Sequence, residues 1–242
     1  MLRHVRGIDH AVILVRDLDR ARDTYARMGF TLTPRGFHSL GSQNHCIMFG
    51  RDYLELMALP AAPPAAFQYF ADFLLKGEGA GALALATDDA AAAHAEVTKA
   101  GVAAEAPLAL SRPVENLGDA RFTLVQLPPA ETPGFRSFLC QHHTRDIVWR
   151  PEHQRHANGV RGIKSVTIAS ADPARYARLL DGISVKYARA DVPSIAAIRL
   201  HVDNTKAAAD SLKRGGFSFV VLNDGALVVA ADAAHGVMLV FG

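Results

Sequence analysis

Hydrophobic and polar positions repeat four times along the 242 residues of this chain. Each copy holds an apolar strand, an Asp or Asn, a short amphipathic stretch, a Gly and a second apolar strand. An Asp or Asn side chain can accept the first free N–H groups of a helix, and Gly favours the left-handed conformation that ends one. The pattern therefore predicts four strand–helix units, whose helices are bounded by Asp17 and Gly29, Asp89 and Gly101, Asp172 and Gly182, and Asn204 and Gly216.

The first unit predicts the order β-α-β-β-β. The nearly continuous apolar run IDHAVILV reads as a strand covered on both faces. In the helix after it, the side chains of an apolar stripe recur at helical spacing: Leu18, Ala21, Tyr25 and Met28. Turn signals then separate three strand candidates at 30–34, 45–50 and 53–59.

The second unit repeats this order, with strands expected at 81–87, 106–110, 121–127 and 136–143. In the third unit the residues between Gly182 and Gly216 are too few for a full copy, so we expect it to be truncated. The fourth is complete. We therefore predict an α+β protein of repeated βαβββ modules in curved mixed sheets, divided into paired modules 1–59 and 65–143 within a domain 1–143, a linker 144–162 and a shorter C-terminal domain 163–242.

Composition narrows the classes of partner. No apolar run approaches the roughly 20 residues that cross a bilayer, and a net charge of +2 without a basic stripe argues against nucleic acid. The first residues contain no apolar stretch of the secretory kind, so we expect a cytoplasmic protein. Cys46 and Cys140 lie in apolar strands, where a free thiol packs as a small hydrophobe and no disulfide is needed.

Two polar residues interrupt the apolar strands of the first unit. Side chains alternate along a strand, so Ile8, His10 and Val12 share one face and Asp9 shares the other with Ala11 and Ile13. If Ala11 and Ile13 pack on the helix, His10 faces a cleft. Glu55 alternates with Leu54 and Leu56 in the same way, and a carboxylate there is costly unless it is paired or metal-bound. The alternatives are a hydrogen-bonded core histidine and a Glu55 exposed at a sheet edge.

These residues carry a family resemblance. The segment GIDHAVILVRDLDRARDTYARMGF, with YLELM after it, resembles the first module of the vicinal oxygen chelate superfamily. HSLGSQNHCIMFGRDYLEL and FLCQHHTRDIVWRPEHQRHANG resemble the glyoxalase-like bacterial branch of that superfamily. The resemblance covers about residues 1–160. Residues 163–242 share only the repeated order of strand, helix and Gly. It implies two modules paired edge to edge around a cleft with a divalent metal, whose ligands come from the first and fourth strands of each module.

The resemblance implies that His10 and Glu55 are metal ligands and catalytic residues, with Glu55 as ligand or proton shuttle. In the second module the position of His10 is taken by Ala82, which offers no ligand. In its fourth strand Gln141 matches Glu55, with His143 on the same face and His142 opposite. The predicted metal set is therefore His10, Glu55 and either Gln141 or His143, suited to Zn, Ni, Mn or Fe.

A small and anionic substrate is expected at the cleft. Arg35, His38 and Asn44 surround the hairpin that borders the cleft in this family, although Asn44 also suits a turn. Trp149 either covers the cleft or anchors the linker.

The function predicted from this resemblance is that of a glyoxalase-type lyase or isomerase using a divalent metal. The alternatives are a metal-free binding or resistance protein and a non-haem iron ring-cleaving dioxygenase. The two modules can pair within one chain, so the cleft does not require a dimer. The resemblance to the superfamily nevertheless implies a homodimer.

Overall fold

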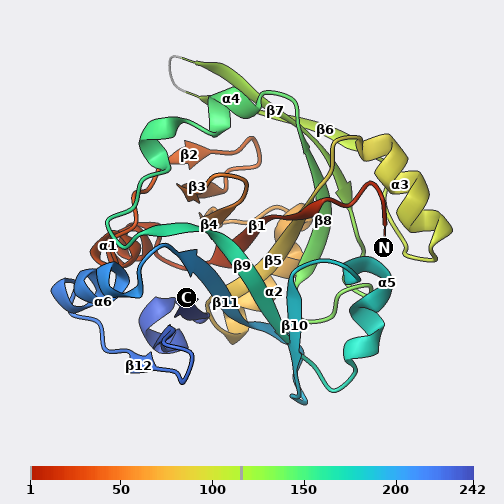
Figure 1. Ribbon diagram of the computed structural model, residues 1–242. Helices are drawn as coiled ribbons and strands as arrows, with labels where there is room; N and C mark the ends of the chain where they lie inside the picture. Colours follow the sequence, from red (N-terminus) through yellow and green to blue (C-terminus); the bar gives the residue numbers. More distant parts are fainter. Residues whose placement is uncertain (1, 115–116) are drawn as a thin grey trace.

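The computed structural model describes residues 2–114 and 117–242. Its strands join into one curved, unclosed mixed sheet, with short helices packed against it (Figure 1). This arrangement confirms the α+β class with repeated modules in curved mixed sheets.

The first module places its strands in the order β2–β3–β4–β1, with β4 parallel to β1. The Asp17 carboxylate accepts the N–H of Arg20 at 2.9 Å and begins the helix, and Gly29 at φ 91° follows it. The strand predicted at 30–34 does not form: the N–H of Thr31 bonds the His156 side chain, and the short strand of this region lies at 36–37. The elements are β1 (Gly7–Leu14), α1 (Leu18–Arg27), β2 (Gly36–Phe37), β3 (Gln43–Met48) and β4 (Tyr53–Ala58).

The second module has the order β5–β8–β7–β6 and joins the first through the antiparallel pair β1–β5. Its elements are β5 (Gly79–Ala86), α3 (Ala90–Lys99), β6 (Leu108–Val114), β7 (Gly118–Gln126) and β8 (Arg136–His142). An unpredicted helix, α2 (Gln68–Lys76), follows the 3₁₀ turn η1 (Ala65–Phe67) and connects the modules. Phe70 and Phe73 of α2 pack against Val12 and Leu14 on the concave face of the sheet.

The last two copies form the order β10–β9–β11–β14–β13–β12. In the third copy, β10 pairs in parallel with β9 just as β4 pairs with β1, and no hairpin intervenes. The elements are β9 (Val160–Ala169), η3 (Pro173–Tyr176), α5 (Ala177–Leu180), β10 (Val185–Ala188), β11 (Ser194–Val202), α6 (Thr205–Arg214), β12 (Val220–Val221), β13 (Leu227–Val229), η4 (Ala231–Ala234) and β14 (Met238–Phe241).

Both pairs of modules share one core. A single cluster of buried apolar side chains runs from Val5 to Phe241, and α1 lies beside α6 (Figure 1). The Tyr25 hydroxyl donates to the carbonyl of Ala234 at 3.1 Å. The predicted linker contains the short helices α4 (Arg145–Val148) and η2 (Pro151–His153). The division into two domains therefore stays a prediction.

Among the described residues, every helix is too short or too polar to cross a membrane.

Candidate active site

His10 and Glu55 meet on the concave face of the first module pair. Nε2 of His10 lies 3.6 Å from Oε2 of Glu55, and both residues are buried. Adjacent strands bring them together, since Val12 is the register partner of Glu55 and His10 that of Tyr53. The His10 ring stacks on the Tyr53 ring at 4.3 Å. The shared face is the one that strand alternation predicts for both residues.

Asp9 lies on the same side, against the prediction that it faces the helix. The pairing of β1 with β5 shifts register between Ile8 and His10, which makes Asp9 the extra residue of a β-bulge. A bulge interrupts alternation and re-aims a side chain. Oδ1 of Asp9 consequently lies 2.6 Å from Nδ1 of His10 and 3.1 Å from Nε2 of His142.

The charge state of Asp9 fixes the orientation of His10. Burial alone would raise the pKa of Asp9, but the hydrogen bonds and positive charge of His10 and His142 hold it well below its usual value. The carboxylate is therefore ionised and accepts the proton on Nδ1 of His10. Nε2 is left facing Glu55.

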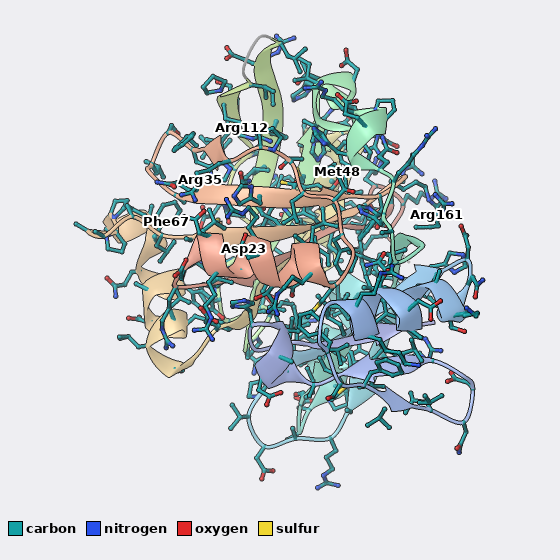
Figure 2. The ribbon with its side chains drawn as sticks, turned by 90° about the vertical axis from the view of Figure 1, so that its left-hand side faces the viewer. Asp23, Arg35, Met48, Phe67, Arg112 and Arg161 are labelled. Carbon is teal, nitrogen blue, oxygen red and sulfur yellow. The ribbon has the colours of Figure 1, made fainter. Side chains whose placement is uncertain are left out.

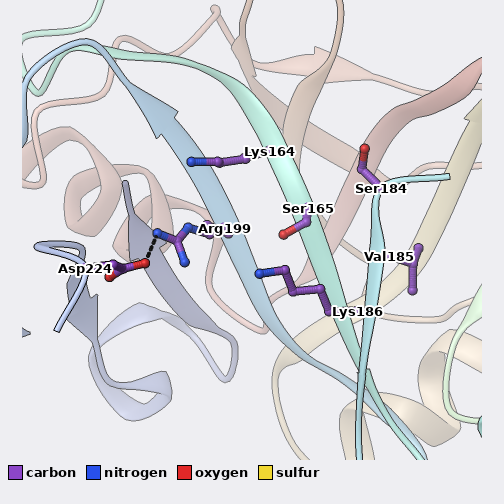
Figure 3. Close-up of a pocket in the computed structure, with 7 residues that line it drawn as sticks. All are labelled: Lys164, Ser165, Ser184, Val185, Lys186, Arg199 and Asp224. Atoms are coloured by element: carbon purple, nitrogen blue, oxygen red, sulfur yellow. Dashed lines mark hydrogen bonds and ion pairs between the residues drawn. The ribbon is translucent and has the colours of Figure 1, made fainter. Parts of the chain in front are cut away.

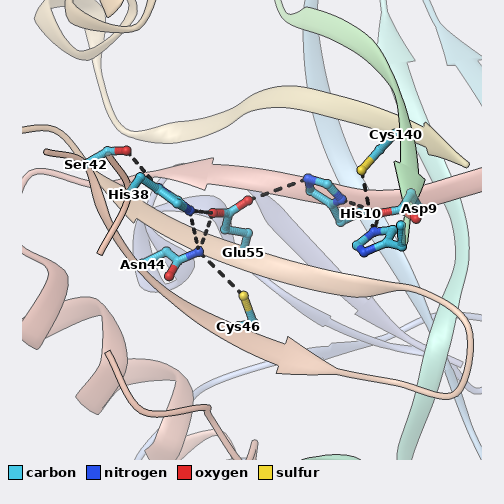
Figure 4. A network of polar contacts seen from close by, with 9 residues as sticks. Asp9, His10, His38, Ser42, Asn44, Cys46, Glu55 and Cys140 are labelled. Atoms are coloured by element: carbon cyan, nitrogen blue, oxygen red, sulfur yellow. Dashed lines mark hydrogen bonds and ion pairs between the residues drawn. The ribbon is translucent and has the colours of Figure 1, made fainter. Parts of the chain in front are cut away.

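The other oxygen of Glu55 is held by the β2–β3 hairpin. Nδ2 of Asn44 donates to Oε1 of Glu55 at 2.6 Å, and Nε2 of His38 lies 3.9 Å from the same oxygen. His38 also contacts the hydroxyl of Ser42 at 2.8 Å. Its side chain is 27% exposed, whereas that of Glu55 is 9% exposed, so His38 lies at the solvent end of the network (Figure 4). Burial lowers the pKa of His38, and the charge of Glu55 offsets part of that effect.

The structure places Gln141 and His143 of the second module away from His10 and Glu55. Gln141 accepts the N–H of Ala90 at 2.9 Å and donates to the carbonyl of Asp88, at the start of α3. His143 contacts Thr123 on the same outer side. Leu139 lies in the core between the sheet and the helices. Because side chains alternate along a strand, Gln141 shares this helix-covered face, whereas His142 lies on the concave face. His142 therefore reaches the site, and Gln141 and His143 do not.

The arginine near the site-facing side chains of the β2–β3 hairpin is Arg112, whereas the sequence analysis named Arg35. Arg35 donates to Gln43 and to Asp19 of α1, both at 2.6 Å, so its guanidinium is engaged away from Glu55. Arg112 of β6, labelled with Arg35 in Figure 2, lies beside the β2–β3 hairpin, since a Cβ built on Gly36 would be 3.4 Å from its Nη1 atom, and its charge helps to lower the pKa of His38. Its register partner Ala120 is buried on the concave face. The strand expected at 106–110 ends before Arg112, so no sequence signal identified this residue.

Trp149 forms an aromatic wall of the site. Its ring lies 4.8 Å from the His142 ring and 5.5 Å from the Tyr53 ring, and the Arg145 guanidinium stacks on it at 3.5 Å. Within the described residues, Trp149 Nε1 and His142 Nδ1 are buried and have no hydrogen-bond partner. Buried polar atoms without partners are rare, so these two atoms mark the region between Trp149 and His142 within the described interior.

The predicted metal set does not fit this geometry. Ala84 is the register partner of His10 on β5, and its own partner on β8 is Phe138, whose ring lies 5.5 Å from that of His10. His10 and Glu55 are thus the only members of the predicted set on the concave face. A different set of side chains could hold a metal ion. Asp9, Cys140 and His142 each offer one donor atom, and these atoms all lie within 4.8 Å of one another. These donor types suit zinc.

A curved sheet of paired βαβββ modules with a polar cluster on its concave face defines the vicinal oxygen chelate class. The family model of the glyoxalase-like domain matches residues 8–184, and the chain belongs to this family. No curated protein matches the chain.

Two solved structures are similar over 98% of this chain. A hypothetical protein from Staphylococcus aureus has a TM-score of 0.69 at 12% identity, with 98% of that chain covered. A mutant of 4-hydroxymandelate synthase from Streptomyces coelicolor has a TM-score of 0.66 at 13% identity, with 92% covered. At these identities the likeness shows the fold alone.

Proposed function

We propose that this chain is a glyoxalase-like isomerase or lyase that moves a proton between adjacent carbons of a small molecule carrying oxygen on both. One observation carries the proposal. The Glu55 carboxylate and Nε2 of His10 lie 3.6 Å apart in a buried site, while Asp9 holds the other nitrogen of the imidazole. General acid–base catalysis needs two such groups within hydrogen-bond reach of the reacting atoms.

The two groups divide the proton transfers of an α-hydroxycarbonyl isomerisation. Glu55 takes the proton from the hydroxyl-bearing carbon and returns it to the former carbonyl carbon. Nε2 of His10 takes the hydroxyl proton and returns it to the former carbonyl oxygen. One C–H and one O–H bond break and one of each forms, so reactant and product are isomers and no oxidant is needed.

The residues around Glu55 and His10 would orient these two side chains and contact a small substrate. Asn44 orients Glu55 by its hydrogen bond to Oε1, and Tyr53 holds the His10 ring by stacking. The unpartnered Nε1 of Trp149 offers a donor to an oxygen of the substrate. Arg112 supplies a positive charge for an anionic substrate, a role that the sequence analysis gave to Arg35. Burial of the pair excludes water from the reacting atoms.

A metal-dependent enzyme is the second candidate, favoured by the donor set of Asp9, Cys140 and His142. A divalent metal bound there would supply Lewis-acid chemistry beside His10. Elemental analysis of purified wild-type protein and His142→Ala tests it. One equivalent of metal that is lost in the variant supports this candidate, and an absence of metal in the wild type removes it.

Isotope exchange tests the proposed proton transfer. The protein is incubated in D₂O with a panel of α-hydroxyketones, 2-oxoaldehydes and their thiol adducts, and deuterium on carbon is followed by NMR. Incorporation with at least one compound supports an enzyme. Binding without exchange would instead indicate a small-molecule binding protein, and oxygen consumption with catechols a dioxygenase.

A further inference from the structure

The third copy carries a counterpart of the candidate active site with its charges reversed. His10 lies seven residues before the helix N-cap Asp17, and Ser165 lies seven residues before the N-cap Asp172. The bulge residue Asp9 corresponds in the same way to Lys164. The register of β9 with β11 passes from Ser165 directly to Ile163, so Lys164 is also the extra residue of an irregular pairing.

The carboxylate position is replaced as well. Glu55 is paired through β4 with Val12, two residues after His10. In the third copy Lys186 is paired through β10 with Thr167, two residues after Ser165. The two acids of the first copy are therefore two lysines in the third.

These residues line an open pocket of about 490 Å³ (Figure 3). In the first pair of modules, side chains of α2 and the region around α4 fill much of the concave face. The face formed by β9, β10 and β11 keeps a cavity that holds Lys164, Lys186 and Arg199, with Asp224 as the one carboxylate in its lining.

The charges of this pocket do not balance. Arg199 pairs with Asp224 at 2.6 Å, and Lys164 and Arg199 both donate to the backbone oxygen of the last residue, Gly242, at 3.2 and 3.1 Å. The Lys186 side chain then has no carboxylate or hydrogen-bond partner among the residues that line the pocket. Like charges that face one cavity raise the local concentration of anions.

A buried hydroxyl points to a ligand independently of the charges. Ser165 is 6% exposed and lines the pocket, and within the described residues its Oγ has no hydrogen-bond partner. A hydroxyl can donate to an anionic oxygen. We propose that this pocket binds a small anion through a phosphate or carboxylate group, with Lys164, Lys186 and Ser165 as its main contacts.

Titration with inorganic phosphate, and separately with acetate, tests the proposal by NMR of backbone amides. We expect saturable shifts at residues 164–167 and 184–186, and the tighter of the two anions identifies the recognised group. Lys186→Gln removes one charge at an exposed position and should weaken binding about tenfold, in line with the strength of charge-assisted hydrogen bonds. Ser165→Ala should weaken it severalfold.

Lys213→Gln is the matched control, because Lys213 is exposed on α6, which packs on the other face of the sheet. It should leave anion binding unchanged. An absence of saturable shifts in the pocket with both anions would overturn the proposal, as would equal dissociation constants for Lys186→Gln and Lys213→Gln. Neither result bears on the Glu55–His10 site, which lies in the other module pair.

Discussion

Asp9 and His10 are consecutive residues of one strand, yet their side chains meet on the same face, with 2.6 Å between Oδ1 and Nδ1. Regular alternation would separate them, and the bulge in β1 removes that separation. The carboxylate also reaches His142. One irregularity of the backbone thus sets the tautomer of His10 and connects the two modules.

Asp9→Asn tests this orientation. The amide keeps the size of the carboxylate but removes the charge that holds the Nδ1 proton. We expect kcat/KM to fall by roughly 100-fold or more, as for other carboxylates that orient a catalytic histidine. ¹⁵N NMR of the imidazole should show a change of tautomer at His10. Unchanged tautomer and rate would mean that Asp9 only packs.

Asn44→Ala removes the donor to the buried Glu55 oxygen. An unpaired buried group costs about 1–3 kcal/mol, and more when it is charged. We expect a loss of this size in the free energy of unfolding, measured with urea. In the Glu55→Gln background the loss should be smaller, because a neutral amide oxygen is left unpaired in place of a charged one. Equal losses in both backgrounds would show that the contact contributes nothing specific.

Asp52 should make stability depend on pH. Burial raises its pKa to about 6, and the N–H of Ile163 offsets part of that rise. The folded state then binds a proton more tightly than the unfolded chain does, so this contribution is complete below about pH 4 and is lost as the pH rises through about 6.

Asp52→Asn should therefore abolish a pH-dependent difference of up to about 3 kcal/mol. Urea unfolding of both proteins between about pH 4 and 7 measures it. A difference between the two proteins that stays constant over this range would contradict the assignment.

Gly215 fixes the approach of α6 to α1. A Cβ built there would lie 2.1 Å from the backbone oxygen of Arg27. Gly215→Ala should force the helices apart and destabilise the protein by about 1–3 kcal/mol, as overpacking does. Gly50→Ala is the control, since a Cβ there meets no atom within 4 Å. Equal stability of the two variants would contradict the close packing of the module pairs.

Much of the fold could be predicted because local signals agreed with it. The caps at Asp17, Asp89 and Asn204 accept helix N–H groups as expected. The truncated third copy follows from spacing alone. The helix α2 was missed because the Pro- and Ala-rich residues 60–64 just before it are typical of a linker between the two modules.

The site was less predictable, because a shift of one residue moves a side chain to the other face. Gln141 was matched to Glu55 by its position in the fourth strand, but Leu139 in the core decides the alternation of β8 and puts His142 on the concave face. Asp9 was misplaced because a bulge has no signal in the apolar run. Arg112 comes from an edge strand whose approach to Gly36 depends on the curvature of the whole sheet.

The central claim is that Glu55 transfers a proton to and from substrate carbon. Glu55→Gln keeps the shape of the side chain and an oxygen that can accept from Asn44, so the fold should persist. Glu105→Gln is the control, at an exposed position.

The most direct measurement is the rate of deuterium incorporation from D₂O into the carbon of a panel compound. The account predicts that Glu55→Gln lowers this rate by about 100-fold or more, while Glu105→Gln matches the wild type. Equal rates for the two variants, or no incorporation by the wild type with any compound, would contradict it.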